Sequence, residues 1–115
     1  MSYDISLTAD VGGPYPISLG ILDENYTWNL GDFFEWFLGK RLSDFNGEEA
    51  WLLREAIERG FEKFDYVYGE PPTTLELLQS FEPENKWGSV PGAICFLSKV
   101  FKACILAPNA KVSVN

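Results

Sequence analysis

The chain has 115 residues, 46% of them hydrophobic and 23% charged, and its formal net charge at pH 7 is −8. This length fits one hydrophobic core, so we expect residues 1–115 to form a single domain. The sequence has no histidine, which excludes Ser-His and Cys-His nucleophilic catalysis and imidazole metal sites. Two cysteines alone cannot form a structural zinc site, and we expect neither a metal nor a cofactor.

The negative charge is concentrated in the first half of the chain. Residues 1–58 carry eleven carboxylates and three basic residues, whereas residues 59–115 carry six of each. A surface of this sign repels nucleic-acid phosphates and attracts basic proteins, because long-range fields steer their encounter. Solubility alone accounts for many acidic proteins. The asymmetry nevertheless favours a protein partner with a basic surface over direct binding to nucleic acid.

Three strands are predicted at the two ends of the chain. The first residues alternate apolar and polar side chains, as in a strand with one buried face, and the apolar set is Tyr3, Ile5, Leu7, Ala9 and Val11. Residues 12–16 are rich in glycine and proline and predict a turn. Ile17, Leu19 and Ile21 then repeat the alternation and complete a β-hairpin. Val112 and Val114 predict a third strand, with the amino-terminal strand in the centre of the sheet.

A first amphipathic helix is predicted over residues 30–38. Its apolar arc contains Leu30, Phe33, Phe34 and Phe37. Asp32 and Glu35 lie on the opposite side, and Trp36 lies at the boundary.

A second helix is predicted to begin at Asn46, which with Glu49 has the spacing of a capping box. Its apolar arc contains Ala50, Leu53, Ile57, Phe61 and Phe64. Trp51 falls on the opposite side, among Glu55, Glu58 and Glu62. We therefore expect Trp51 to be exposed or covered by a loop.

Two more helices are predicted in the second half. Thr73 and Glu76 form another capping-box pattern, which predicts a short helix ending near Phe81. A long helix over residues 91–106 is predicted to be the most buried, with a wide apolar arc of Ile94, Leu97, Val100, Phe101, Cys104 and Ile105. Cys95 falls on its polar side near Lys99 and Lys102. The two cysteines are over two turns apart and cannot pair, which favours a reducing cytoplasm.

These elements predict an α+β fold, a three-stranded antiparallel sheet covered on one face by three or four helices. The chain shows no pattern of a signal peptide and no apolar run of membrane-spanning length, so no membrane association is expected.

Two clusters of aromatic and amide residues stand before predicted helices, at residues 25–29 and 84–88. Asn and Thr side chains commonly cap helices, and this is their ordinary use. The same residues could instead line a pocket for a small nucleotide-like signal. The residues of this alternative site are Asn25, Thr27, Trp28, Asn29, Asn85 and Trp87.

A third possibility is a hydrolase that uses a carboxylate pair. Asp32 and Glu35 share one helix face at the i, i+3 spacing. Solvated helix faces usually carry such pairs, which makes surface charge the better interpretation. We assign no catalytic residue.

The order and spacing of several motifs resemble a family of small phage and prophage proteins. The motifs are Met1-Ser2-Tyr3-Asp4-Ile5, Asn25-Tyr26-Thr27-Trp28-Asn29, Pro83-Glu84-Asn85-Lys86-Trp87-Gly88, and a long closing helix before a terminal Val-x-Val strand. The resemblance spans nearly the whole chain. It implies an accessory protein that acts in the cytoplasm of a bacterial host. Small acidic proteins of this class often inhibit host defence machinery, including CRISPR effectors.

The sequence as a whole favours a binding protein that occludes a basic surface on a host protein. Tryptophan is enriched among residues that dominate binding energy, and an exposed tryptophan suggests a use. The predicted contact residues are Trp36 with Asp32 and Glu35, and Trp51 with Glu55 and Glu58. The oligomeric state is left open.

Overall fold

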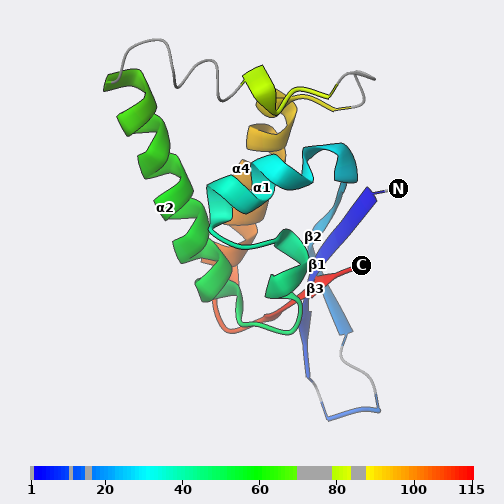
Figure 1. Ribbon diagram of the computed structural model, residues 1–115. Coiled ribbons are helices and arrows are strands. Elements are labelled where there is room, and N and C mark those ends of the chain that lie inside the picture. The colour runs from blue at the N-terminus through cyan, green and yellow to red at the C-terminus, as the bar shows by residue number, and fades with distance from the viewer. Residues whose placement is uncertain (1, 11, 15–16, 70–78, 84–87) are drawn as a thin grey trace.

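The computed structural model describes residues 2–10, 12–14, 17–69, 79–83 and 88–115. Its strands are β1 (Ser2–Ala9), β2 (Ile17–Thr27) and β3 (Lys111–Val114), and its helices are α1 (Gly31–Leu38), α2 (Ala50–Gly69) and α4 (Val90–Leu106). Short 3-10 turns occupy Trp28–Leu30 and Leu42–Phe45. The predicted α+β class with an antiparallel sheet is confirmed (Figure 1).

The sheet has the strand order β2-β1-β3, so the amino-terminal strand is central, as predicted. Ile5 pairs with Val114, and Leu7 pairs with Val112. All four side chains are buried, because paired residues in an antiparallel sheet point to the same face. The opposite face carries polar residues such as Asp4, which is exposed.

The alternation predicted for the second strand is wrong at Ile21. Ser6 pairs with Asp23 but Thr8 pairs with Ser18, so β2 contains extra residues between these pairs. Gly20 lies in this irregular section with a φ of 74°, a backbone conformation that residues with a Cβ rarely adopt. The bulge reverses the phase of the strand. Leu22 is therefore buried while Ile21 is 43% exposed.

The helices form a layered core in which α2 is the outermost. Rings of Phe34 and Phe96 pack around Tyr26 on the sheet, with centroid distances of 6.1 and 5.5 Å. Helix α2 contacts α1 and α4 and touches the sheet mainly near β3. The prediction of helices covering one sheet face is therefore refined, because α2 packs on other helices. Of the short helix predicted before Phe81, residues 70–78 lie outside the described residues, and the helix ends at residue 80.

The predicted start of the second helix is wrong. Helix α2 begins at Ala50, and Asn46 follows the preceding 3-10 turn. The Asn46 Oδ1 atom accepts a hydrogen bond from the Val114 N–H at 2.9 Å, so this amide supports strand β3 rather than capping a helix. The N–H groups of Ala50 and Trp51 donate to Ala110 and Pro108 carbonyls instead. A tertiary contact has replaced the local capping box.

Helix α4 matches the predicted element closely but its buried face is rotated. Phe96 and Ala103 are buried, while Ile105 is 51% exposed, contrary to the prediction. The reason is that α4 packs on β2 through Phe96 as well as on α2 through Phe101. The prediction for the thiols is confirmed, because Cys95 is exposed and Cys104 is buried.

Across the part of the chain that the structure describes, no helix is both long and apolar enough to cross a membrane.

Candidate partner-binding surface

Trp51 lies in the first turn of α2 and is 37% exposed. Its backbone N–H donates to the Pro108 carbonyl at 3.0 Å, which anchors the start of α2 to the segment after α4. Its indole N–H donates to Glu49 Oε2 at 3.2 Å. The ring is thus held by a hydrogen bond at the surface. The prediction of an exposed Trp51 is confirmed.

The end of α4 places two more apolar side chains at the same end of the molecule. Ile105 is 51% and Leu106 73% exposed. Leu106 is two residues before Pro108, whose carbonyl accepts the hydrogen bond from the Trp51 N–H. We call Trp51, Ile105 and Leu106 the Trp51 patch. Exposed apolar residues gathered from two helices are typical of a contact surface rather than of scattered surface residues.

Carboxylates follow Trp51 along the same side of α2. Glu58 and Glu62 are exposed and Glu55 is partly exposed. Glu55 lies 4.0 Å from Arg59, and Glu49 lies 3.9 Å from Lys111, both in solvent-exposed ion pairs. Such pairs contribute little to stability, so these charges remain available to a partner. The sequence prediction grouped Trp51 with Glu55 and Glu58, and the structure keeps all three on the outer side of α2.

Arg54 of α2 lies close to Cys104 of α4, and the sequence analysis did not single it out. Its guanidinium lies near Cys104 and opposes the effect of burial, which raises the pKa of that thiol to about 11. The Nε atom is buried and has no hydrogen-bond partner among the described residues. The apolar period of α2 does not predict this contact of Arg54, because the residue lies at the edge of the buried arc.

Trp36 lies at the boundary of α1, as predicted, and is half-buried. Its ring packs against Phe33 and Phe81 at centroid distances of 6.0 and 5.8 Å. Lys63 lies over the ring at 5.4 Å and donates to the Trp36 carbonyl. Burial lowers the pKa of Lys63, with a further contribution from Arg59. These contacts describe a packing role, and binding by Trp36 stays a prediction.

Asp32 and Glu35, the carboxylates predicted beside Trp36, are exposed on α1. Asp32 raises the pKa of Tyr3, but burial of that phenol is the larger cause. Nothing in the described surroundings of the pair adds a group suited to hydrolysis. Their role in binding stays a prediction.

In the described residues, the first aromatic and amide cluster contacts the segment at Gly88 and Ser89 through Tyr26 and Thr27. The Tyr26 hydroxyl donates to the Ser89 carbonyl and accepts from the Ser89 N–H, both at 2.9 Å. Gly88 fits closely, because a Cβ there would lie 2.5 Å from Thr27 Cγ2. Asn25 and Asn29 are exposed, and Thr27 Oγ1 accepts from the Asn29 N–H at 3.3 Å.

The contact between the clusters is closed packing in its described part. Asn85 and Trp87 lie outside the described residues, as does the side chain of Trp28. The pocket for a nucleotide-like signal therefore stays a prediction.

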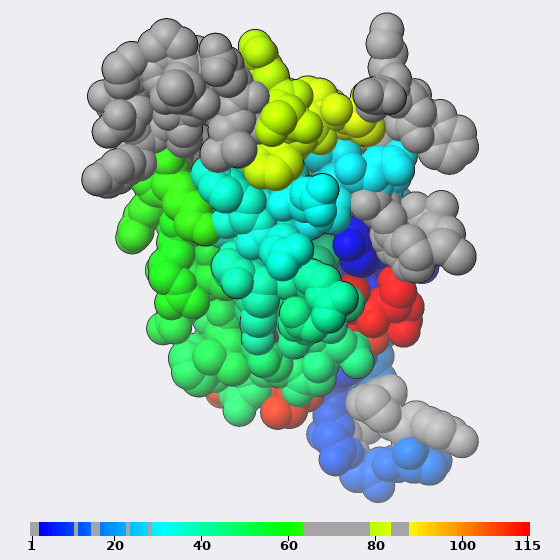
Figure 2. All heavy atoms as spheres, in the orientation of Figure 1, coloured from blue at the N-terminus to red at the C-terminus, as the bar shows by residue number. Residues whose placement is uncertain are grey.

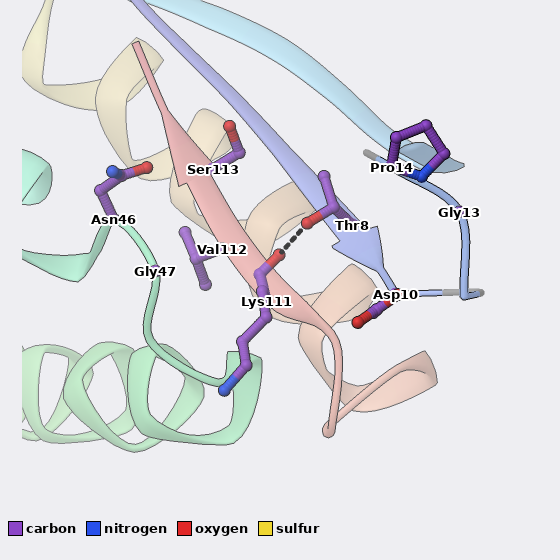
Figure 3. Close-up of a pocket in the computed structure, with 9 residues that line it drawn as sticks. All are labelled: Thr8, Asp10, Gly13, Pro14, Asn46, Gly47, Lys111, Val112 and Ser113. Atoms are coloured by element: carbon purple, nitrogen blue, oxygen red, sulfur yellow. Dashed lines mark hydrogen bonds between the residues drawn. The ribbon is translucent and has the colours of Figure 1, made fainter. Parts of the chain in front are cut away.

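One hollow of about 460 Å³ lies between the hairpin turn, β3 and the turn at Asn46 (Figure 3). Its polar side chains include Asp10 and Lys111, but Asp10 accepts from the Gly12 N–H and Lys111 pairs with Glu49. A smaller hollow of about 330 Å³ is lined by Lys40, Glu48 and Arg59, among others. Neither is lined by a predicted site residue.

Within the described ranges, no group of three or more His, Cys, Asp or Glu side chains is arranged to hold a metal ion. No protein-family model, curated protein or solved structure matches the chain.

Proposed function

We propose that this chain is a phage-encoded accessory binding protein that inhibits a host defence protein, in the manner of an anti-CRISPR, by occluding a basic surface. The observation that carries the proposal is the Trp51 patch. An indole at the surface, hydrogen-bonded to Glu49 and at the same end of the molecule as the exposed Ile105 and Leu106, is the kind of apolar anchor that dominates interface energies.

The charge around the anchor supports a basic partner. Glu55, Glu58 and Glu62 lie on the same outer side of α2, and the whole chain carries a net charge of −8. Complementary charge at the rim of an interface mainly raises the association rate and sets its salt dependence.

The bacterial setting and the class of target come from the sequence motifs that resemble phage and prophage proteins. The host protein with a basic surface, and the cytoplasm of the bacterial host as its location, belong to the same proposal. These assignments can be tested together, because all require a specific bacterial protein to bind the Trp51 patch.

The experiment is capture of partners from a bacterial lysate with four tagged proteins, followed by quantitative mass spectrometry. Wild type and Trp51→Phe should retain the same protein, because phenylalanine keeps an aromatic anchor. Trp51→Ala should retain at least tenfold less, since loss of a hot-spot residue costs about 2 kcal/mol or more. Ile17→Ala is the matched control, because Ile17 is an exposed apolar residue (49%) on the hairpin.

Equal retention by wild type and Trp51→Ala would overturn the proposal. The same conclusion would follow if Ile17→Ala lost the protein to the same extent, since the loss would then not be specific to the Trp51 patch.

A further inference from the structure

The two outer edges of the sheet differ in whether their backbone groups are hydrogen-bonded. Along β3, the N–H and C=O of Val112 bond to Glu48 and Gly47 at 2.8 and 2.7 Å, and Asn46 accepts from Val114. This segment closes the β3 edge as an additional strand would. Along the outer edge of β2, no backbone hydrogen bond is found among the described residues. An open edge is a template for another strand.

The register fixes which residues face outward from β2. Asp4 and Asn115 exchange both backbone hydrogen bonds, at 2.9 Å each, so the polar groups of Asp4 point toward β3. Successive residues of a strand point their N–H and C=O groups to alternate sides. Ile5 therefore faces β2 and pairs with Glu24, which leaves the backbone groups of Asn25 and Asp23 directed outward.

The open section of the β2 edge is short, and a structural feature bounds it at each end. The bulge at Gly20 interrupts the regular pairing with β1 before Asp23. At the other end Gly88 lies against Thr27, where even a Cβ would not fit. Bulges are a common protection of strand edges, so only the section from Asp23 to Tyr26 remains regular and uncovered by described residues. The hairpin projects from the body of the molecule (Figure 2).

The charges that the hairpin itself carries have one sign, and Lys99 of α4 pairs with one of them, Glu24, at 3.9 Å. The hairpin over residues 2–27 contains Asp4, Asp10, Asp23 and Glu24 and no lysine or arginine. Asp4 is directly opposite Asn25 on the exposed face of the sheet, and its carboxylate has no ion pair among the described residues. A strand that carries like charge would be repelled, and so would the hairpin of a second copy.

We infer that the edge of β2 from Asp23 to Tyr26 binds an extended, basic peptide segment of a partner protein by strand addition. The backbone groups of Asp23 and Asn25 supply the hydrogen bonds, and Asp4 attracts a lysine or arginine on the added strand. Main-chain bonding gives this mode its affinity, while side chains that alternate along the strand give its specificity. The site is separate from the Trp51 patch, so it stands or falls independently of the proposed function.

The test uses an acetylated and amidated pentapeptide of alternating lysine and valine, with amide hydrogen exchange followed by NMR. At a peptide concentration about ten times the Kd, exchange of the Asp23 and Asn25 amides should slow by roughly tenfold, because about nine-tenths of the sites are filled. The inward-facing Glu24 amide is already paired with β1 and should change little. Trp51→Ala should show the same slowing as wild type.

Two matched variants test whether the outward N–H of β2 is responsible for peptide binding. Asn25→Pro removes one outward N–H without touching the β1 ladder, since proline is tolerated on an edge strand, and should abolish slowing at Asp23. Asn25→Thr keeps the N–H and should retain it. Retained folding of Asn25→Pro is checked by the exchange protection of Ile5, which is in the central strand.

Several results would overturn the inference. One is no slowing in wild type, and another is equal slowing with a glutamate-for-lysine peptide or with a peptide whose alternate amides are N-methylated. Slowing that appears without peptide and rises with protein concentration would show that a second copy occupies the edge instead.

Discussion

The Tyr26 hydroxyl holds both backbone polar groups of Ser89, donating to the carbonyl and accepting from the N–H at 2.9 Å each. Ser89 is also the N-cap of α4, where its Oγ accepts from the Gly92 N–H at 3.0 Å. One phenol therefore fixes the start of α4 to strand β2. Tyr26 and Ser89 are 63 residues apart in sequence, so no local sequence pattern predicts this contact.

Tyr26→Phe should lower the free energy of unfolding by about 1–3 kcal/mol, because two part-buried backbone groups lose their partner. Urea denaturation measures the change. Gly92→Ala provides a coupling test, since a Cβ at that position would lie 2.3 Å from the Tyr26 oxygen. Gly92→Ala should cost less in the Tyr26→Phe background than in wild type. Strictly additive costs would contradict the close contact.

Much of the fold could be predicted because it depends on local period. The alternation of Tyr3 to Ala9 and the 3.6-residue period of α1 and α4 both survive in the structure. The failures are tertiary. Asn46 has a side chain suited to an N-cap. In the structure its Oδ1 atom instead accepts the N–H of Val114 in β3.

The candidate site could be predicted only in part. Exposure of Trp51 follows from its angular position on α2, which the sequence alone gives. The contribution of Ile105 and Leu106 depends on how α4 is rotated between β2 and α2. The position of Arg54 beside Cys104 depends on the same packing. Helical period cannot show which neighbour each side of a helix meets.

Ile5→Asp should prevent cooperative folding. Ile5 is 1% exposed in the central strand, and a carboxylate there would be buried without a partner. Thr8→Asp is the matched control, because this side chain lies on the polar face opposite Lys111, and the change should move the melting temperature by only a few degrees. Thermal melts followed by circular dichroism compare them. Equal melting temperatures would show that the assigned strand face is wrong.

The two thiols should differ in reactivity. Cys95 is exposed, whereas Cys104 is buried and burial raises its pKa to about 11. At pH 8 a maleimide should label Cys95 much faster than Cys104, since the thiolate is the reactive form. Mass spectrometry after brief labelling gives both rates. Comparable rates in the native protein would contradict the orientation of α4.

The same pKa shift predicts a dependence of stability on pH. The folded state holds the Cys104 proton more tightly than the unfolded state, whose thiol has a pKa of 9.0. The stabilisation is therefore complete below pH 9 and is lost as the pH rises toward about 11. Over this window wild type should lose more stability than Cys104→Ala. Parallel losses would show that Cys104 ionises alike in both states.

Trp36→Ala and Trp51→Ala should differ in stability. Trp36 packs against Phe33 and Phe81, so its loss should cost about 2 kcal/mol or more. Trp51 is at the surface, and its removal should cost less than about 1 kcal/mol. Urea denaturation of the two variants gives both values. A large loss for Trp51→Ala would make it a packing residue instead of a binding anchor.

The most direct test of the account is the affinity of the purified, captured partner for wild type and for Trp51→Ala, measured by titration calorimetry. The account predicts a Kd at least tenfold higher for Trp51→Ala, with its fold unchanged. A variant in which Glu55, Glu58 and Glu62 are replaced by glutamine should associate more slowly at low salt and approach the wild-type rate at high salt. An unchanged Kd for Trp51→Ala would contradict the claim that this tryptophan anchors the partner.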